Sequence, residues 1–268
     1  ADFDIHVGKV SKIATGLKYS YNDMKYNRLY EYFKNNLWQT INDLSGNDRY
    51  TENISAVYFR YTTRFRNNFS LALGLRGDYT YAVPSTNSTM VADKQNYFSL
   101  FPSFNLSMPL NEKQSQMFVL SYNRRIRRPS FWTLVPVRTP ISETSYQVGN
   151  PKLQPVFAND INFSWIFGRK YSLNLGVQIR KDDIAQVMER ASDNSDIIVF
   201  MFKNISNSTQ WYANLSLPAQ ITPWWGMTTN LTGFNMRNTI QDGEKNFRSG
   251  IQANMNNTFT VAKKWYID

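Results

Sequence analysis

The feature that most constrains this chain is an alternation of apolar and polar residues with a period of two. From Phe69 to Tyr81, the odd positions carry mostly Leu, Tyr and Phe, whereas the even positions carry Ser, Ala, Gly, Arg, Asp and Thr. The same alternation runs from Tyr171 to Arg180 and from Phe247 to Val261. Successive side chains of a strand point to opposite faces, so this period predicts β-strands that each have one apolar face. No segment shows a convincing amphipathic helix.

The connections between these segments alternate in length. Those at 8–10, 66–68, 111–114, 168–170, 218–223 and 262–264 are short, whereas those at 22–50, 83–96, 126–155 and 238–246 are long. The connection at 191–195 is the weak point, because it is no longer than 218–223. The alternation predicts an up-and-down meander with tight turns at one rim and large loops at the other. The twelve expected strands are 1–7, 11–21, 51–65, 69–82, 97–110, 115–125, 156–167, 171–190, 196–217, 224–237, 247–261 and 265–268.

The composition of the two faces separates a soluble sheet from a membrane barrel. Mean hydropathy is −0.48, yet 15% of the residues are aromatic. The polar face is mainly Ser, Asn, Gln, Gly and Thr, which suits a watery interior, and many aromatic residues fall near the expected strand ends. Aromatic girdles, strands of this length and alternating connections are typical of outer-membrane barrels. We therefore expect an all-β, antiparallel, up-and-down transmembrane β-barrel in the outer membrane. A soluble β-rich binding or enzymatic module is the competing class.

The residue inventory argues against several kinds of chemistry. The chain has no cysteine and a single histidine, His6, so thiol chemistry, histidine-based triads, zinc sites and haem ligation are not expected. Asp182, Asp183, Asp193 and Asp196 lack the spacing of an EF-hand. We expect no enzyme activity, no metal or cofactor, and no nucleic-acid partner. The net charge of +10 fits either basic surface loops or attraction to anionic lipid headgroups or anionic cargo.

The segment from Leu120 to Pro155 combines more charge and proline than any other stretch. Its arginines have two alternative interpretations. Arginine presents a planar fork of donors, so these residues could bind anionic sugars or lipopolysaccharide phosphates. Alternatively, some of them point inward and pair with carboxylates that hold the loop. Strand alternation places Arg125 and Arg127 on one face and Arg124 and Arg128 on the other. The candidate substrate-binding residues are Arg124, Arg125, Arg127, Arg128 and Trp132.

The prolines of this segment indicate a loop of fixed shape. A residue that precedes proline is restricted to extended geometry, and proline itself fits the end of a strand because it lacks an N–H group. Glycine can adopt a positive φ where a turn requires one. Such a loop could fold over the mouth or into the interior of a barrel, or it could simply cap the rim. The residues with this expected structural role are Pro129, Gly149, Asn150, Pro151 and Pro155.

The same segment resembles a known family. It contains the sequence SYNRRIRRPSF from Ser121, LVP from Leu134 and GNPKLQP from Gly149. This pattern resembles the barrel region of TonB-dependent receptors of Gram-negative bacteria, in the branch called the outer membrane protein beta-barrel family. Weaker matches are GLKYS from Gly16, GLRGDY from Gly74, LFPS from Leu100 and KNI from Lys203. Together they cover nearly the whole chain.

The resemblance implies a 22-stranded barrel that is blocked by an N-terminal plug, which contacts TonB and allows energised uptake. Residues 1–268 match only the barrel portion, so we expect a barrel domain cut at both ends, with any plug outside this chain. The expected function is TonB-dependent uptake of a nutrient. A passive porin-like, structural or adhesion barrel is the alternative. The expected partners are outer-membrane lipid and lipopolysaccharide, TonB through the plug, and, as a further candidate, a surface lipoprotein.

Overall fold

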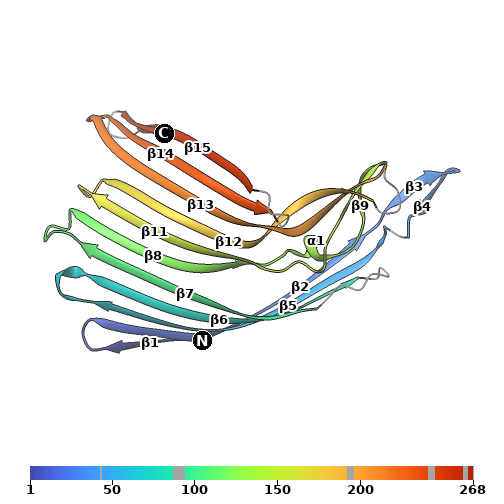
Figure 1. Cartoon of the computed structure of the whole chain (residues 1–268), viewed down its shortest axis with the longest axis horizontal. Helices are drawn as coiled ribbons and strands as arrows, with labels where there is room; N and C mark the ends of the chain where they lie inside the picture. The colour runs from blue at the N-terminus through green and yellow to red at the C-terminus, as the bar shows by residue number, and fades with distance from the viewer. Residues whose placement is uncertain (43, 87–93, 192–195, 241–244, 262–264, 268) are drawn as a thin grey trace.

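The chain folds into one large antiparallel sheet that curves around an interior (Figure 1). The computed structural model describes residues 1–268 except 43, 87–93, 192–195, 241–244, 262–264 and 268. Within the described residues, twelve strands pair in chain order and form the wall. They are β1 (Asp2–Val7), β2 (Ser11–Arg28), β5 (Gly46–Arg64), β6 (Ser70–Thr86), β7 (Gln95–Pro109), β8 (Gln116–Arg127), β11 (Val156–Phe167), β12 (Tyr171–Arg190), β13 (Ile198–Thr222), β14 (Trp225–Ile240), β15 (Lys245–Val261) and β16 (Trp265–Ile267).

The predicted asymmetry of the two rims is confirmed. The tight turns gather at the left end of Figure 1, and the longer connections gather at the right end. Several tight turns use residues in the left-handed region, including Gly8 (φ 67°), Asn67 (φ 62°), Asn68 (φ 60°) and Gly168 (φ 61°). Asparagine and glycine tolerate this conformation better than other residues. We call the end with the tight turns the turn rim and the opposite end the loop rim.

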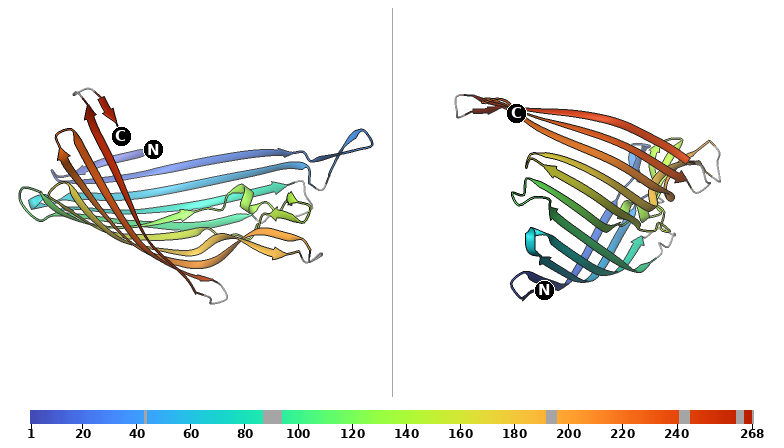
Figure 2. Two further views of the ribbon diagram at one scale, coloured as in Figure 1. Left: turned by 90° about the horizontal axis from the view of Figure 1, so that it is seen from above. Right: turned by 60° about the vertical axis from the view of Figure 1, so that its left-hand side comes forward.

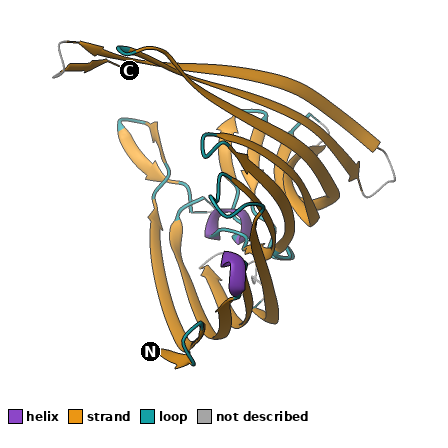
Figure 3. Cartoon of the chain, turned by 90° about the vertical axis from the view of Figure 1, so that its left-hand side faces the viewer, coloured by secondary structure: helices purple, strands orange, loops and turns teal. Residues whose placement is uncertain are grey.

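The two faces of the wall follow the alternation of the sequence. Leu73 and Leu75 of β6 are paired with Phe104 and Pro102 of β7, and they lie on the exposed apolar face. Asp78 and Thr80 lie on the opposite face and are almost fully buried beneath the long loop between β8 and β11. We call the apolar face the outer face and the face beneath this loop the inner face. The end-on view in Figure 3 shows the strands curving around this interior.

The connection between β2 and β5 differs from its prediction as a loop over 22–50. β2 continues to Arg28 and β5 begins at Gly46, so both ends of the expected loop are extensions of the wall. The tip forms a separate hairpin of β3 (Glu31–Lys34) and β4 (Leu37–Thr40), which projects beyond the loop rim (Figure 2). Asn35 (φ 54°) and Asn36 (φ 59°) form its two-residue turn. Such an Asn pair between strand-forming residues is a hairpin signal that the prediction did not use.

The wall also extends further than predicted at the turn rim. β13 was expected to end at 217, but it runs through Pro218 to Thr222. Pro218 pairs with Thr228 of β14, whereas the pairing between β13 and β12 stops at Ser216. A proline is tolerated there because it needs no ladder bond on the unpaired side.

The described strands form a partial wall. β1 and β16 lie at opposite ends of the strand order and do not pair with each other. Among the described residues, no helix has both the length and the apolar character that crossing a membrane requires.

Candidate functional site

The long connection between β8 and β11 folds against the inner face of the wall. This segment, residues 128–155, is called the inner loop below. It contains α1 (Phe131–Leu134), β9 (Thr139–Ser142) and β10 (Ser145–Val148). The sequence left open whether this loop folds over the mouth or into the interior, or simply caps the rim. The structure shows a loop that folds into the interior.

Aromatic packing anchors the start of the inner loop. The Phe131 side chain is 2% exposed, and its ring stacks on Tyr26 of β2 with a centroid distance of 4.4 Å. Tyr50 of β5 contacts the same ring edge-on at 6.1 Å. Tyr50 lies beyond the ten or so residues of β5 nearest the turn rim, which is the length that spans a membrane. Burial, and then the Glu52 carboxylate, raise the pKa of the Tyr50 phenol, so it stays neutral. The buried cluster around Phe131 comprises Tyr50, Ala82, Leu134, Val135, Val137 and Leu153.

A buried ion pair provides the second anchor. Arg128 Nη2 lies 3.2 Å from Asp78 Oδ2 and 3.1 Å from Thr80 Oγ1, both on β6. Asp78 is 3% exposed, and its carboxylate also accepts a hydrogen bond of 2.6 Å from Arg76 Nε. Charge-assisted hydrogen bonds of this kind are stronger than neutral ones. Arg128 is thus held as a structural residue between the inner loop and the wall.

Backbone and amide contacts join the end of the inner loop to β13. β10 pairs in parallel with Ile198–Met201, a part of β13 that lies beyond the last pairing of β13 with β14. Asn150 Nδ2 donates to the Phe202 carbonyl at 2.9 Å. Asn204 accepts from the Gln154 backbone N–H at 2.8 Å and donates to the Gln154 carbonyl at 3.0 Å. The loop therefore bridges β6 and β13, which are far apart in the strand order.

The sequence suggested that Gly149 is needed for a positive φ. The structure shows instead that it is needed because the backbone of Val135 approaches it closely. A Cβ atom at this position would lie 2.1 Å from the Val135 carbonyl oxygen and 2.8 Å from the Val135 nitrogen. Its φ lies outside the left-handed region, where Gly8 and Gly168 are found. Pro129 follows the end of β8 at Arg127 and Pro155 precedes β11, as expected for residues without an N–H group.

Replacing Gly149 with alanine is expected to loosen the inner loop, because the clash is with backbone atoms that cannot rotate away. Overpacking of this kind typically reduces stability by about 1–3 kcal/mol. The measurement is the rate of proteolysis within residues 128–155 in the folded, membrane-embedded protein. Gly226→Ala is the matched control, since the nearest atom to its added Cβ would lie at 3.6 Å. Equal proteolysis of the two variants would contradict the packing argument.

The four arginines occupy three different environments. Arg124 lies over the Phe157 ring at 4.5 Å, on the outer face. Arg125 and Arg127 share one face, as their alternation predicted, and the structure shows that it is the inner face. Arg128 was expected on the face of Arg124, and this expectation is wrong because β8 ends at Arg127 and the alternation ends with it.

Arg125, Arg127 and Arg180 form a basic patch on the inner face, called the arginine patch below. Arg127 Nη2 lies 2.6 Å from Asp183 Oδ1, and Arg180 Nη1 lies 3.6 Å from Asp183 Oδ2. Arg125 Nε lies 3.7 Å from Asp160 Oδ2. The side chains of Arg125 and Arg127 remain 71% and 62% exposed. Three cations thus share two carboxylates, and the excess positive charge can attract an anion.

A bulge in β12 shapes this patch. Asp182 has φ 57°, and the pairing of β12 with β13 shifts on both sides of Asp183 before the register is restored. Bulges re-aim side chains next to functional sites. Here the bulge brings the Asp183 carboxylate to Arg127 and Arg180. The sequence pattern did not predict this bulge.

Trp132 lies apart from the ion pairs of the arginine patch, in the aromatic cluster. Its indole meets the Tyr26 ring edge-on at 4.6 Å and is 51% exposed. It lines a cleft of about 30 Å³ together with Arg28, Asp48 and Gln147. Arg28 Nε donates to Asp48 Oδ2 at 2.6 Å in this cleft. The volume fits little more than one water-sized group.

Sequence reasoning missed the wall residues that hold the inner loop. Asp78 and Asn204 both lie in the weaker motifs, GLRGDY and KNI, but neither motif by itself indicates a partner. The structure places these motifs against RRPS and GNPKLQP, respectively.

Within the described residues, no group of three or more His, Cys, Asp and Glu side chains is arranged to hold a metal.

Comparisons with known proteins agree on the architecture. The model of a family described as the outer membrane protein beta-barrel family matches residues 1–268. No protein with a curated description matches the sequence. Similar solved structures include the copper transporter OprC, with 15% identity, a TM-score of 0.69, and coverage of 94% of this chain and 39% of that chain.

Two further similar structures carry printed descriptions of iron import. The ferric-catecholate import receptor Fiu from E. coli K12 has 12% identity and a TM-score of 0.62, covering 97% of this chain and 41% of that chain. The FrpB iron transporter from Neisseria meningitidis has 13% identity and a TM-score of 0.56, covering 98% of this chain and 40% of that chain. The chain thus spans about two fifths of the length of these proteins. At such low identity, the likeness concerns the fold.

Proposed function

The chain belongs to the outer membrane protein beta-barrel family, and on that premise we propose that it forms part of the wall of a TonB-dependent receptor that imports an anionic solute. The proposed unit is a single barrel domain over residues 1–268, within a complete barrel of 22 strands. The support is the fold shared with chains described as transporters and an import receptor. Those chains are more than twice as long, so the proposal concerns the whole protein that contains this wall.

The arginine patch is the observation that supports an anionic cargo. Arg125 and Arg127 extend from the inner face with most of their side chains exposed. A low-dielectric wall that presents charges of one sign concentrates counter-ions in front of it. Arg128 has a different role, because its guanidinium is used to hold the inner loop. Arg124 lies on the outer face and is proposed to have no direct contact with cargo.

Trp132 remains a candidate contact for cargo at the start of the inner loop. Half of its side chain is exposed, and the aromatic cluster fixes its orientation. Exposed aromatic side chains in fixed orientation are suited to apolar contacts in ligand sites.

The proposed mechanism requires partners outside this chain. A plug would close the barrel and contact TonB, which couples opening to the inner-membrane proton gradient. A surface lipoprotein is a further proposed partner at the loop rim. The wall itself is proposed to be non-catalytic, which is supported by the transport descriptions of the similar structures.

Replacing Arg125 and Arg127 together with glutamine is expected to reduce binding of an anionic solute by about tenfold at low salt. Each charge-assisted hydrogen bond contributes about 1.5–3 kcal/mol, and part of this is lost to solvent screening. The measurement is binding of a ferric-catecholate complex and of an acidic oligosaccharide to the purified full-length protein. The difference between variant and parent should shrink as salt increases, because the Debye length shortens.

Arg124→Gln is the matched control, since it removes the same charge from the outer face. Unchanged binding in the double variant would contradict an anion site in the arginine patch.

Uptake in cells with and without a protonophore separates an energised receptor from a passive pore. Uptake that continues at full rate with the protonophore would favour a passive pore over an energised receptor.

A further inference from the structure

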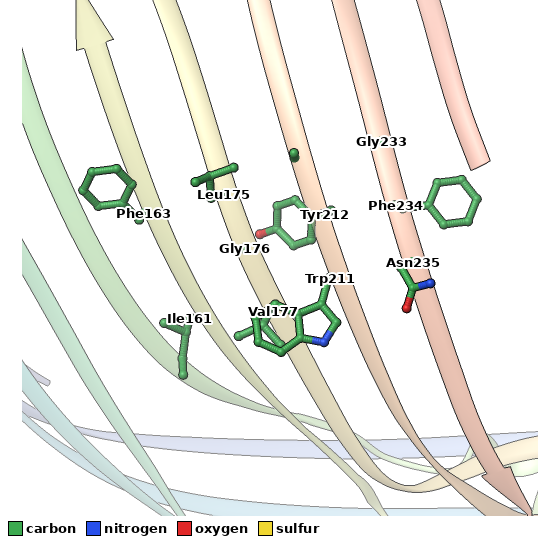
Figure 4. A pocket seen from close by; sticks show the side chains of 11 residues that line it. Ile161, Phe163, Leu175, Gly176, Val177, Trp211, Tyr212, Gly233, Phe234 and Asn235 are labelled. Carbon is green, nitrogen blue, oxygen red and sulfur yellow. The ribbon is translucent and has the colours of Figure 1, made fainter. Parts of the chain in front are cut away.

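The outer face contains an apolar groove where two small residues interrupt the layer of side chains. Ala213 of β13 is paired with Gly233 of β14, and a Cβ atom added to Gly233 would meet nothing within 4 Å. The groove has a volume of about 540 Å³. Tyr212 and Phe234 line it from positions between two rows of outer-face side chains. The larger side chains of these two rows come from β11, β12 and β13, and Figure 4 shows them. They are Phe163 and Leu175 in the row nearer the turn rim, and Ile161, Val177 and Trp211 in the next row.

The groove lies within the membrane-facing part of the wall. Leu175 is four positions above Tyr171, which stacks with Phe167 in the aromatic girdle of the turn rim. At about 3.3 Å per residue and a tilt of about 40°, Leu175 is roughly 10 Å above that girdle. The apolar band of such barrels is about 25 Å tall, so the groove begins near its middle.

The polar side chains that line the groove are those of Trp211, Tyr212 and Asn235, and none of them lies in the row nearer the turn rim. Trp211 and Asn235 are paired with each other, one row nearer to the loop rim than Ala213 and Gly233. On the side toward the turn rim, the next row of the outer face is the paired Leu215 and Leu231. The groove therefore extends from near the middle of the apolar band toward the loop rim, so a lipid whose chain lies in it has its headgroup at that rim. The loop rim faces the outside of the cell, because barrels of this type have short periplasmic turns and longer extracellular loops.

We propose that this groove holds one acyl chain of an outer-leaflet lipid, of the lipid A type, as a bound lipid distinct from the freely exchanging lipids around the barrel. The medium at this face is hydrocarbon, so the occupant must be apolar and must enter from the membrane. The groove is deeper than the neighbouring wall because Ala213 and Gly233 leave its floor open. Dispersion contacts on several sides of one chain favour it over a chain on a smooth wall.

Quenching of tryptophan fluorescence tests the proposal in the full-length protein purified in detergent micelles. A phospholipid with brominated acyl chains is titrated in, and unbrominated lipid A or phosphatidylethanolamine is then added as competitor. Quenching is expected to saturate near one lipid per protein and to be reversed by lipid A at lower concentration than by phosphatidylethanolamine. The variant Trp211→Phe is expected to lose most of the saturable component, because Trp211 lines the groove.

Gly233→Leu and Ala213→Leu are each expected to weaken the saturable binding about tenfold, since each fills the floor and removes contacts worth roughly two methylenes. Ala253→Leu is the matched control, because Ala253 lies on the same face of β15 but does not line the groove. Heat-dependent migration on a gel verifies that each variant is folded. Quenching that rises without saturation, or saturable binding that is equal in all variants, would overturn the proposal. Equal competition by the two lipids would overturn the outer-leaflet assignment.

Discussion

Replacing Leu175 with arginine is expected to reduce assembly of the protein into the outer membrane by at least tenfold. Leu175 is on the outer face near the middle of the apolar band, and it is 43% exposed. An arginine at the midplane of a barrel's lipid face destabilises it by about 2–4 kcal/mol. The measurement is the fraction of folded protein recovered from outer membranes, together with the free energy of unfolding in lipid vesicles.

Asn174→Arg is the matched control, one position away on the same strand. Asn174 lies on the inner face, where its side chain accepts a hydrogen bond of 2.6 Å from Ser164 Oγ. The variant loses this hydrogen bond but keeps its charge in contact with the watery interior. We expect a loss of about 1 kcal/mol, which is typical of one neutral hydrogen bond. Equal defects in the two variants would show that the faces are assigned wrongly.

The wall was predictable because every second side chain of a strand faces the same environment, so the residue types alternate with that environment. The alternation from Phe69 to Tyr81 assigns each residue of β6 to a face, and one pairing register then extends the assignment to its neighbours. Turn positions such as Asn67 and Gly168 also follow from backbone preference. These are local properties, so the sequence alone expresses them.

The inner loop was less predictable because its contacts join residues that are distant in the chain. Arg128 and Asp78 are fifty positions apart, as are Gln154 and Asn204. Proline and glycine indicate that a loop has a fixed shape, but they do not identify its partners. The side on which Arg128 lies depends on where β8 ends, and strand ends are the least certain part of a pattern-based prediction. The β3–β4 hairpin was missed for a different reason, because its four-residue strands are too short to show a period.

The bridge between β6 and β13 explains why Asp78 has two arginine partners. Without the inner loop, Asp78 and Thr80 would be in contact with water in the interior. The Asp78 carboxylate would then need no arginine partner. With the loop in place, the carboxylate is removed from water and needs the guanidiniums of Arg76 and Arg128. The ion pair thus makes the position of the loop specific, while the Phe131 cluster supplies most of the apolar burial.

Replacing Asp78 with alanine is therefore expected to release the start of the inner loop. Removal of one partner from a buried ion pair destabilises a protein by about 3–5 kcal/mol, and we expect the lower end because Arg128 retains 21% exposure. A loss of about 3 kcal/mol raises the open population of the loop by roughly a hundredfold. The measurement is the rate of tryptic cleavage at Arg138 in the membrane-embedded protein.

Asp23→Ala is the control for this experiment, since Asp23 pairs with Arg49 at an exposed site on the other face of the wall from the inner loop. An exposed pair contributes about 0–1 kcal/mol, so its loss should leave cleavage at Arg138 unchanged. Arg128→Met should behave less severely than Asp78→Ala, because Arg76 still satisfies the Asp78 carboxylate after Arg128 is removed. If Asp78→Ala and Asp23→Ala are cleaved at the same rate, the inner loop is held by apolar packing, and the ion pair has no role in its position.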